Sequence, residues 1–316
     1  MIKKVKFFNL LNSSNNILKK IEKEIKNEIE STLELSVNLN SKEFLLSLKN
    51  NFFTLLMLSI LKNEKISEKN IIEYGKIIVY LRQIITSTDN IIDSERKGFI
   101  RSNKLSNLIV ENSLIQLLCK NLVSKSLIKL GDTSLELDNK LLTFIGKIAY
   151  SENLRNVNTS KEYPTYEYIL NSIHSGIGGN LLELSLIIPI SLEDKTTSDS
   201  LLNYSKGLYL IGMALQNLDD YFDMKEDFYN SKYNLYSSIL IEKNICSQEA
   251  LEAHLNGSND FIELFSKELK SVKENTLKGL SLFMDQGFPI TEEDSLILLK
   301  ELFKVRGMEK EYNLLY

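Results

Sequence analysis

The sequence predicts an all-α protein, and two observations carry that prediction. Three prolines and 13 glycines are few for 316 residues, and both residue types interrupt helices. Apolar residues recur at intervals of three and four, whereas the alternation typical of strands is hard to find. A chain of this length can bury a core sufficient for one domain. We therefore expect a single α-helical domain over residues 1–316, with a peripheral N-terminal helix within residues 1–40.

The predicted elements of the N-terminal half follow this periodicity. A surface helix is expected over 15–35, capped by Ser13, Ser14 and Asn15, and an interior helix over 41–65. From Ser67 a helix that is apolar nearly all round runs into Asp89, as expected at the centre of a bundle. Two further helices are expected over 105–131 and 134–150, the first ending at Gly131.

The C-terminal half begins after a polar connector, in which we place Arg155 on the surface. The expected helix over 166–190 contains Gly176, Gly178 and Gly179, and three helix-weakening residues so close together predict a break. A helix over 201–224 follows and ends in an acidic cluster. Loop signals at 256–257 and 286–289 divide the remainder into helices.

Composition excludes several classes of function. The formal charge of −4 and the lack of a basic cluster argue against nucleic-acid binding. Cys119 and Cys246 are far apart and flanked by apolar residues, which indicates reduced, buried thiols and no zinc site. The N-terminus does not resemble a secretory signal, and no stretch reaches 18 apolar residues without a charge. We expect a soluble, cytoplasmic protein without stable membrane insertion.

The acidic cluster GMALQNLDDYFDMKED is the clearest candidate site. Asp219 and Asp223 stand one helical turn apart on one face, with Asp220 at its edge. Hard oxygen donors at this spacing suit magnesium. A solvated acidic face is the alternative, but a second cluster, with Asp89 and Asp93 at the same spacing, follows another long apolar helix and favours a site.

The two clusters together resemble the aspartate-rich motifs of the class I isoprenoid synthase superfamily. The run DNIID, with Asp89, Asn90 and Asp93 in its polar places, resembles the DDxxD motif of trans-isoprenyl diphosphate synthases and class I terpene synthases. QNLDDYFD, preceded by Gly212, resembles the second motif of the diphosphate synthases. The resemblance implies a helical bundle of the isoprenoid synthase type, with the two motifs facing each other across the mouth of a central apolar cavity.

The resemblance also implies a ligand set and a reaction. Three magnesium ions, bound with the diphosphate, would be held by Asp89, Asp93, Asp219 and Asp223, the residues that would also be catalytic. Departure of the diphosphate would leave an allylic cation in the cavity. A homodimer is likewise implied by the resemblance alone.

Other residues fall at positions that the family uses. The expected diphosphate contacts are Arg96, Lys97, His174, Gln216, Lys232 and Arg306. The expected cavity residues are Ile84, Ile85, Thr88, Gly178 and Tyr312. For Arg96 and Lys97 a charged helix end is the competing interpretation, and for His174 it is a histidine bonded to a neighbouring carbonyl.

One departure from the family pattern favours one reaction over the other. Chain-elongating synthases carry a GGKRxRP-like segment before the first motif, which grips isopentenyl diphosphate, but here Leu48–Phe53 offers only Lys49. Asn and Phe do not replace a bidentate phosphate contact. We therefore expect a terpene synthase that ionises a farnesyl, geranylgeranyl or longer prenyl diphosphate and cyclises or quenches the cation. The alternatives are a prenyltransferase and an inactive partner subunit of a heteromeric prenyl synthase.

Overall fold

The structure is a computed structural model and confirms the all-α prediction. It describes residues 2–32, 37–39, 48–92, 94–102, 105–132, 136–156, 162–257 and 261–316. The chain divides into two compact units, unit 1 (Met1–Asp138 and Ser191–Thr197) and unit 2 (Asn139–Ile190 and Ser198–Tyr316). The single domain expected from chain length stays a prediction.

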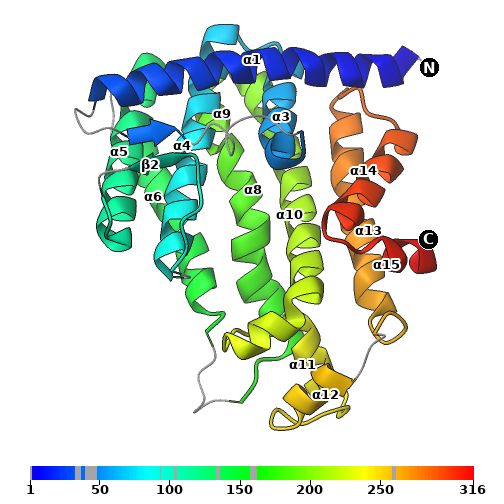
Figure 1. Cartoon of the computed structure of the whole chain (residues 1–316). Coiled ribbons are helices and arrows are strands. Elements are labelled where there is room, and N and C mark those ends of the chain that lie inside the picture. The colour runs from blue at the N-terminus through cyan, green and yellow to red at the C-terminus, as the bar shows by residue number, and fades with distance from the viewer. Residues whose placement is uncertain are drawn as a thin grey trace. The chain divides into compact units, whose positions relative to one another are not determined.

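Within its described residues, unit 1 contains four long helices and a small two-stranded ladder (Figure 1). The two short strands pair antiparallel, with Asn38 opposite Arg101. The elements are α1 (Ile2–Thr32), β1 (Val37–Leu39), α3 (Leu48–Asn63), α4 (Glu68–Ile92), β2 (Ile100–Ser102) and α5 (Leu108–Lys129).

Helix α1 begins at Ile2, well before the predicted start. The prediction that Ser13–Asn15 caps this helix is wrong, because the serines lie inside it. The Ser14 hydroxyl donates to the Leu10 carbonyl at 2.9 Å, one turn earlier, and accepts from Ser59 on α3 at 2.9 Å. A hydroxyl bonded back along its own helix is compatible with a helix interior.

A buried cation docks α1 against α4. Lys76 is fully buried, and its Nζ lies 2.8 Å from Glu73, 2.9 Å from Glu28 and 3.3 Å from Glu24. The Tyr80 hydroxyl donates to Glu28 at 2.7 Å. A buried charge is tolerated only when it is paired in this way.

Unit 2 holds the remaining helices and the candidate site. Its elements are α6 (Glu136–Asn153), α7 (Tyr166–Tyr168), the π-helix η1 (Ile169–Asn180), α8 (Leu181–Glu183), the 3-10 turn η2 (Leu184–Leu186), α9 (Ile187–Leu192), α10 (Lys195–Tyr229), α11 (Leu235–Glu242), α12 (Leu251–Gly257), α13 (Ser266–Asp285), α14 (Glu292–Val305) and α15 (Glu309–Leu315). Three of these elements begin or end beyond the bounds of unit 2: α6, α9 and α10.

The predicted break in the glycine-containing helix takes the form of a change in winding. Residues 169–180 form a π-helix, a rare form seen mostly as short insertions within α-helices, and the chain stays helical from Tyr166 to Leu192. A side chain at Gly178 would meet the Gly212 carbonyl oxygen on α10 at 2.5 Å, so these two helices touch backbone to backbone. Gly207 and Gly279 make a second such crossing, between α10 and α13. The helices η1, α10 and α13 therefore run side by side (Figure 1).

The stretch Tyr166–Leu192 is also long and apolar enough to cross a membrane, by length and composition only. In the folded chain, 56% of its most apolar window is buried. A core helix passes the same test, and η1 contributes Ile169 and Ile173 to the core of unit 2.

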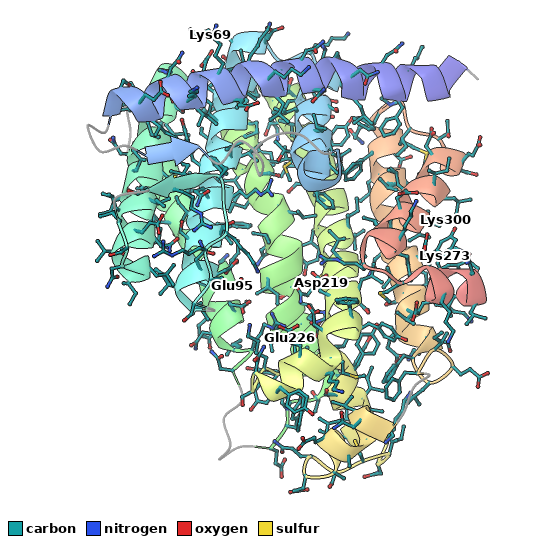
Figure 2. All side chains as sticks on the ribbon, viewed as in Figure 1. Lys69, Glu95, Asp219, Glu226, Lys273 and Lys300 are labelled. Atoms are coloured by element: carbon teal, nitrogen blue, oxygen red, sulfur yellow. The ribbon has the colours of Figure 1, made fainter. Side chains whose placement is uncertain are left out.

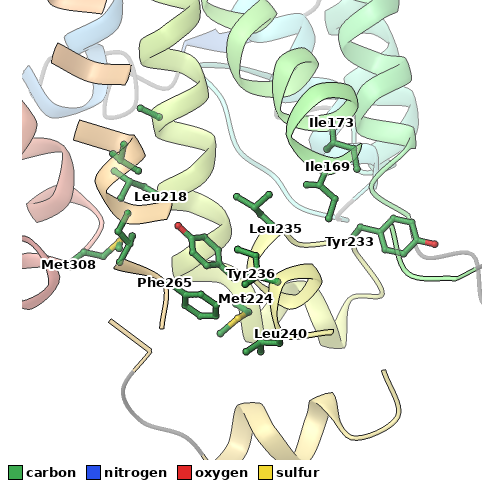
Figure 3. Packing of buried hydrophobic residues seen from close by; sticks show 14 of the residues in the cluster. Ile169, Ile173, Leu218, Met224, Tyr233, Leu235, Tyr236, Leu240, Phe265 and Met308 are labelled. Atoms are coloured by element: carbon green, nitrogen blue, oxygen red, sulfur yellow. The ribbon is translucent and has the colours of Figure 1, made fainter. Parts of the chain in front are cut away.

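Figure 3 shows this core around the C-terminal end of α10. Leu218 and Met224 of α10 pack with Leu235 and Tyr236 of α11 and with Phe265, which precedes α13. The packing fixes the side of α10 that faces inward and leaves the acidic side to other partners.

Helix α10 is longer than predicted at both ends. It begins at Lys195 because the Asp194 carboxylate accepts from the amides of Thr196 and Thr197 at 3.0 and 3.2 Å, as a helix cap does. It continues to Tyr229, so residues 225–229, which lie beyond the predicted end at 224, are also helical. The predicted ends at Gly131 and Gly287 are confirmed, since both glycines adopt positive φ, +95° and +76°. Both cysteines are free and buried, as expected.

Candidate active site

Four aspartates line the last three turns of α10, and they divide into two environments. Asp219 and Asp223, one turn apart, are half-buried, whereas Asp220 and Asp227 are buried. Figure 2 shows Asp219 on α10, with Glu226 nearer the C-terminal end of the helix. The spacing predicted from the sequence is therefore present, but only two of the four aspartates are partly exposed.

Asp220 is held by neighbours on three elements. Its Oδ2 lies 2.8 Å from His174 Nε2 on η1 and accepts from the Leu235 amide at 2.8 Å, while its Oδ1 accepts from Gln216 Nε2 at 3.0 Å. Burial would raise the pKa of Asp220, but His174, Arg155 and the Leu235 amide outweigh burial and hold that pKa below its usual value.

This arrangement gives His174 and Gln216 a partner different from the expected diphosphate. His174 is fully buried, and reaching a phosphate would require it to leave Asp220. Among the described residues its Nδ1 has no hydrogen-bond partner. The neighbouring-carbonyl alternative is not what the structure shows either, since the bonded atom is a carboxylate oxygen.

Asp219 lies against Arg306, which ends α14. The Arg306 guanidinium is 2.6 Å from Asp219 Oδ1. Burial, together with repulsion from Asp223 and Asp220, raises the pKa of Asp219 to about 6, although Arg306 and Arg155 oppose the rise. Arg306 thus lies at the acidic cluster, and its diphosphate contact stays a prediction.

The pKa of Asp223 depends on several of the same charged neighbours. Burial and the neighbouring Glu226 raise its pKa, and Arg306 opposes the rise. Two carboxylates with raised pKa values on one helix face form a site that an added cation stabilises.

Arg155 corrects one sequence prediction. The expected position is the surface, but its side chain is only 14% exposed, and its Nη2 donates to both oxygens of Asp227 at 3.1 and 3.2 Å. Asp227 also accepts from Asn234 at 2.8 Å. Burial raises the pKa of Asp227 to about 6, although Arg155 opposes the rise. Periodicity gives no signal for Arg155, because it lies in an irregular connector.

Lys232 is half-buried in the turn after α10, and its amide donates to the Asp227 carbonyl at 2.8 Å. Lys225, a second lysine that follows the acidic motif, is exposed on α10 itself. Lys232 therefore lies in the turn that directly follows the acidic cluster, and its diphosphate contact stays a prediction.

The first motif, at the end of α4 in unit 1, is only partly described. Asp89 is exposed, and Asp93 lies outside the described residues. Asn90 is buried: its side chain donates to the Lys97 carbonyl and accepts from the Lys97 amide, both at 2.9 Å, and it donates to Asn112 at 3.0 Å. Asn90 thus closes the turn after α4 instead of offering a metal ligand.

The two basic residues after this motif have protein partners. Arg96 donates to the Ser106 carbonyl and lies 3.6 Å from Glu111, while Lys97 pairs with Glu95. Both remain exposed at the surface of unit 1. Their diphosphate contacts stay predictions, and the side chain of Lys49 lies outside the described residues.

The predicted cavity residues occupy varied places. Ile84 and Ile85 are half-buried, and Thr88 is exposed and bonded to Gln116 at 2.9 Å. Gly178 has a packing reason of its own at the Gly212 crossing. Tyr312 packs on Phe303 and Tyr316, with ring centroids 5.7 and 5.1 Å away. A cavity role for any of them stays a prediction.

The donor chemistry of the α10 cluster fits a magnesium ion. Within the described residues no three His, Cys, Asp or Glu side chains are placed to hold a metal by themselves. Magnesium commonly takes one or two carboxylates and completes its shell with waters and phosphate oxygens. Asp219 and Asp223 meet that requirement, whereas Asp220 does not, because both of its oxygens already have partners.

No protein-family model and no curated protein matches the sequence. Solved structures do match. A polyprenyl synthase from Roseobacter denitrificans is similar with a TM-score of 0.60 at 14% identity, over 96% of this chain and 99% of that one. The geranylgeranyl pyrophosphate synthetase from the archaeon Geoglobus acetivorans gives 0.51 at 15% identity, over 98% and 100%. The chain has the isoprenoid synthase fold.

A third structure with this fold carries ligands. It is a polyprenyl synthase from Caulobacter crescentus CB15 complexed with calcium and isoprenyl diphosphate, with a TM-score of 0.57 at 11% identity, over 96% of this chain and 95% of that one. These matches confirm the predicted fold class, an all-α protein of the isoprenoid synthase type. At these identities they establish the fold alone.

Proposed function

We propose that the protein is a magnesium-dependent prenyltransferase, which ionises an allylic prenyl diphosphate and joins the prenyl group to isopentenyl diphosphate or another acceptor. The half-buried pair Asp219 and Asp223 on α10 carries the proposal, because it offers oxygen donors and raised pKa values on one helix face. The similar structures, which are named as prenyl synthases, favour transfer over the cyclisation expected from the sequence.

In this proposal the carboxylates bind metal and do not react themselves. Asp219 and Asp223 would hold magnesium in unit 2. Asp89 and Asp93 are proposed as further metal ligands because their motif resembles the first aspartate-rich motif of the family. Magnesium, with three ions proposed, supplies Lewis-acid stabilisation of the departing diphosphate. Asp220, held by His174 and Gln216, fixes the orientation of the α10 face.

Basic residues would balance the remaining negative charge. Arg306 is already at the cluster and is able to donate to phosphate oxygens through its planar fork. Lys232 would add a point charge from the following turn. With Arg306 paired to Asp219, ligand entry would exchange a carboxylate partner for a phosphate partner.

A class I terpene synthase is the second candidate, and one observation favours it. The segment Leu48–Phe53 contains no arginine, so a bidentate grip on a second diphosphate is missing there. An enzyme that ionises a single diphosphate does not need that grip.

The two candidates differ in their requirement for an acceptor. Purified protein with magnesium and geranyl, farnesyl or geranylgeranyl diphosphate, each with and without isopentenyl diphosphate, should give a longer prenyl diphosphate only in the presence of isopentenyl diphosphate. Mass spectrometry of the extracted products reads the outcome. A hydrocarbon or alcohol formed without isopentenyl diphosphate would identify a terpene synthase instead, and no turnover of any substrate would favour the inactive partner subunit.

The cellular location and the oligomeric state are also part of the proposal. A soluble cytoplasmic protein that binds no nucleic acid agrees with the net charge of −4. A homodimer would cover exposed apolar side chains such as Ile109, Leu117 and Ile128 on α5, which are 59%, 69% and 61% exposed.

A further inference from the structure

Arg155 contacts the turn after α10 through both its side chain and its main chain. The side chain reaches Asp227 with Nη2 at 3.1 and 3.2 Å from the two carboxylate oxygens. The Arg155 carbonyl accepts from the Tyr233 amide, and the next residue, Asn156, pairs with Lys232 in an antiparallel bridge. One short segment therefore holds the turn from two sides.

The turn itself is built on Asp227. The Lys232 amide donates to the Asp227 carbonyl at 2.8 Å, and Ser231 adopts a positive φ of 55°. Asn234 donates to the Asp227 carboxylate and to the Asp220 carbonyl, both at 2.8 Å, so it ties the far side of the turn to the acidic cluster. Asp227 is the acceptor that Arg155 and Asn234 share.

Removing the arginine would leave this arrangement unbalanced. Asp227 is 5% exposed, and a buried carboxylate that loses its cationic partner is strongly destabilised. The charge would be relieved by opening the turn to water, which moves Lys232. A lysine in place of Arg155 would keep the charge but lose the planar fork.

We propose that Arg155 is a positioning residue that fixes Lys232 beside the acidic end of α10, so that Lys232 is ready to bind the diphosphate group of the substrate. The diphosphate part of this inference rests on the proposed function. The positioning part rests on the contacts of residues 155–156 with residues 227–233 alone.

Limited trypsin digestion tests the positioning part without any ligand. Arg155→Gln should increase the rate of cleavage after Lys232 by about tenfold, because it removes the charge-assisted contact between Arg155 and Asp227. Cleavage after Lys225, within α10, should not change. The double variant Arg155→Gln, Asp227→Asn, which removes the unpaired carboxylate, should restore part of the protection, and Lys267→Gln on the exposed face of α13 should behave as wild type. An unchanged rate at Lys232 in folded Arg155→Gln would overturn the inference.

Binding of magnesium and inorganic pyrophosphate, measured by calorimetry, tests the diphosphate part. Arg155→Gln and Lys232→Gln should each weaken binding about tenfold, and the double variant should bind as weakly as Lys232→Gln alone, because Arg155 acts through Lys232. Additive losses, about a hundredfold together, would contradict that route. A wild-type protein that binds no pyrophosphate would contradict the proposed function, and cleavage at Lys232 would then decide the positioning alone.

Discussion

Asp219 and Asp220 are consecutive in the sequence and opposite in character. Asp220 has a lowered pKa, with hydrogen bonds from His174, Gln216 and the Leu235 amide. Asp219 has a pKa raised to about 6 and faces a half-exposed arginine. Asp220 is therefore fully bonded within the protein, whereas Asp219 is the carboxylate for which we propose a cation.

Substitution of Asp219 should stabilise the metal-free protein at neutral pH. A carboxyl whose pKa rises from 3.8 to about 6 on folding binds protons more tightly in the folded state, so wild-type stability falls as the pH rises through that window. Asp219→Asn removes this loss and should raise the free energy of unfolding by about 1 kcal/mol at pH 7.5, allowing for partial exposure. Thermal unfolding at pH 7.5 and at pH 3.5 measures it, and the gain should vanish at the lower pH.

Asp220→Asn is the matched substitution, and its effect should have the opposite sign. It removes a buried charge that His174 and Arg155 stabilise, so the free energy of unfolding should fall by about 2–3 kcal/mol. Because the pKa of Asp220 is lowered on folding, its contribution is present at neutral pH and is lost as the pH falls through the folded-state pKa. Equal effects of the two substitutions at pH 7.5 would show that the two environments are not distinct.

Helical spacing is enough to predict which residues share the α10 face, but not which carboxylate is buried and fully hydrogen-bonded. That distinction depends on two partners of Asp220 outside α10. His174 lies far earlier in the sequence, and Leu235 follows the end of the helix. Arg155 escapes prediction for the same reason. The sequence feature that could have indicated Arg155 is the residue type itself, because arginine is rare here, with five of the 38 basic residues. Both arginines of unit 2, Arg155 and Arg306, contact this cluster.

At the scale of elements, glycine pairs set the spacing of η1, α10 and α13. A Cβ at Gly212 would lie 2.2 Å from the Gly178 carbonyl oxygen, which is backbone and has little freedom to move. The glycines of residues 166–190 predict the break in that helix. They do not predict the partner, because nothing in the sequence around Gly212 marks it as a helix contact.

Gly212→Ala should therefore separate two helices and lower the free energy of unfolding by about 2–3 kcal/mol. Gly146→Ala on α6 is the control, since a Cβ at that position would meet nothing within 4 Å. There alanine should stabilise the helix by about 0.5–1 kcal/mol. Chemical denaturation of the two variants gives the comparison, and a loss at Gly146 as large as that at Gly212 would rule out the close crossing as its cause.

Other element boundaries differ from the prediction where side chains act on the backbone. The serines near residue 14 suggest a cap, but they bond within α1. Asp194 and not a later residue starts α10. In each case the residue type is informative, and its partner decides the outcome.

At the scale of the whole molecule, two short motifs predict a fold that spans the entire chain. The isoprenoid synthase fold appears here at 11–15% identity to the solved structures compared, so the resemblance rests on a few residues in a helical frame. The sequence does not settle the reaction. The absence of a basic segment at Leu48–Phe53 favours an enzyme that ionises a single diphosphate, whereas the similar structures are named as prenyl synthases, which favours transfer to an acceptor.

We propose that the carboxylates of both motifs serve one magnesium-dependent ionisation. The most direct measurement is the rate of pyrophosphate release from farnesyl diphosphate, with isopentenyl diphosphate present, as magnesium is titrated. The wild-type protein should release pyrophosphate only with magnesium. Asp89→Asn and Asp223→Asn should each slow release by about a hundredfold or more, whereas Asp285→Asn, at the exposed end of α13, should not. Full release by either motif variant, or release without magnesium, would contradict the claim.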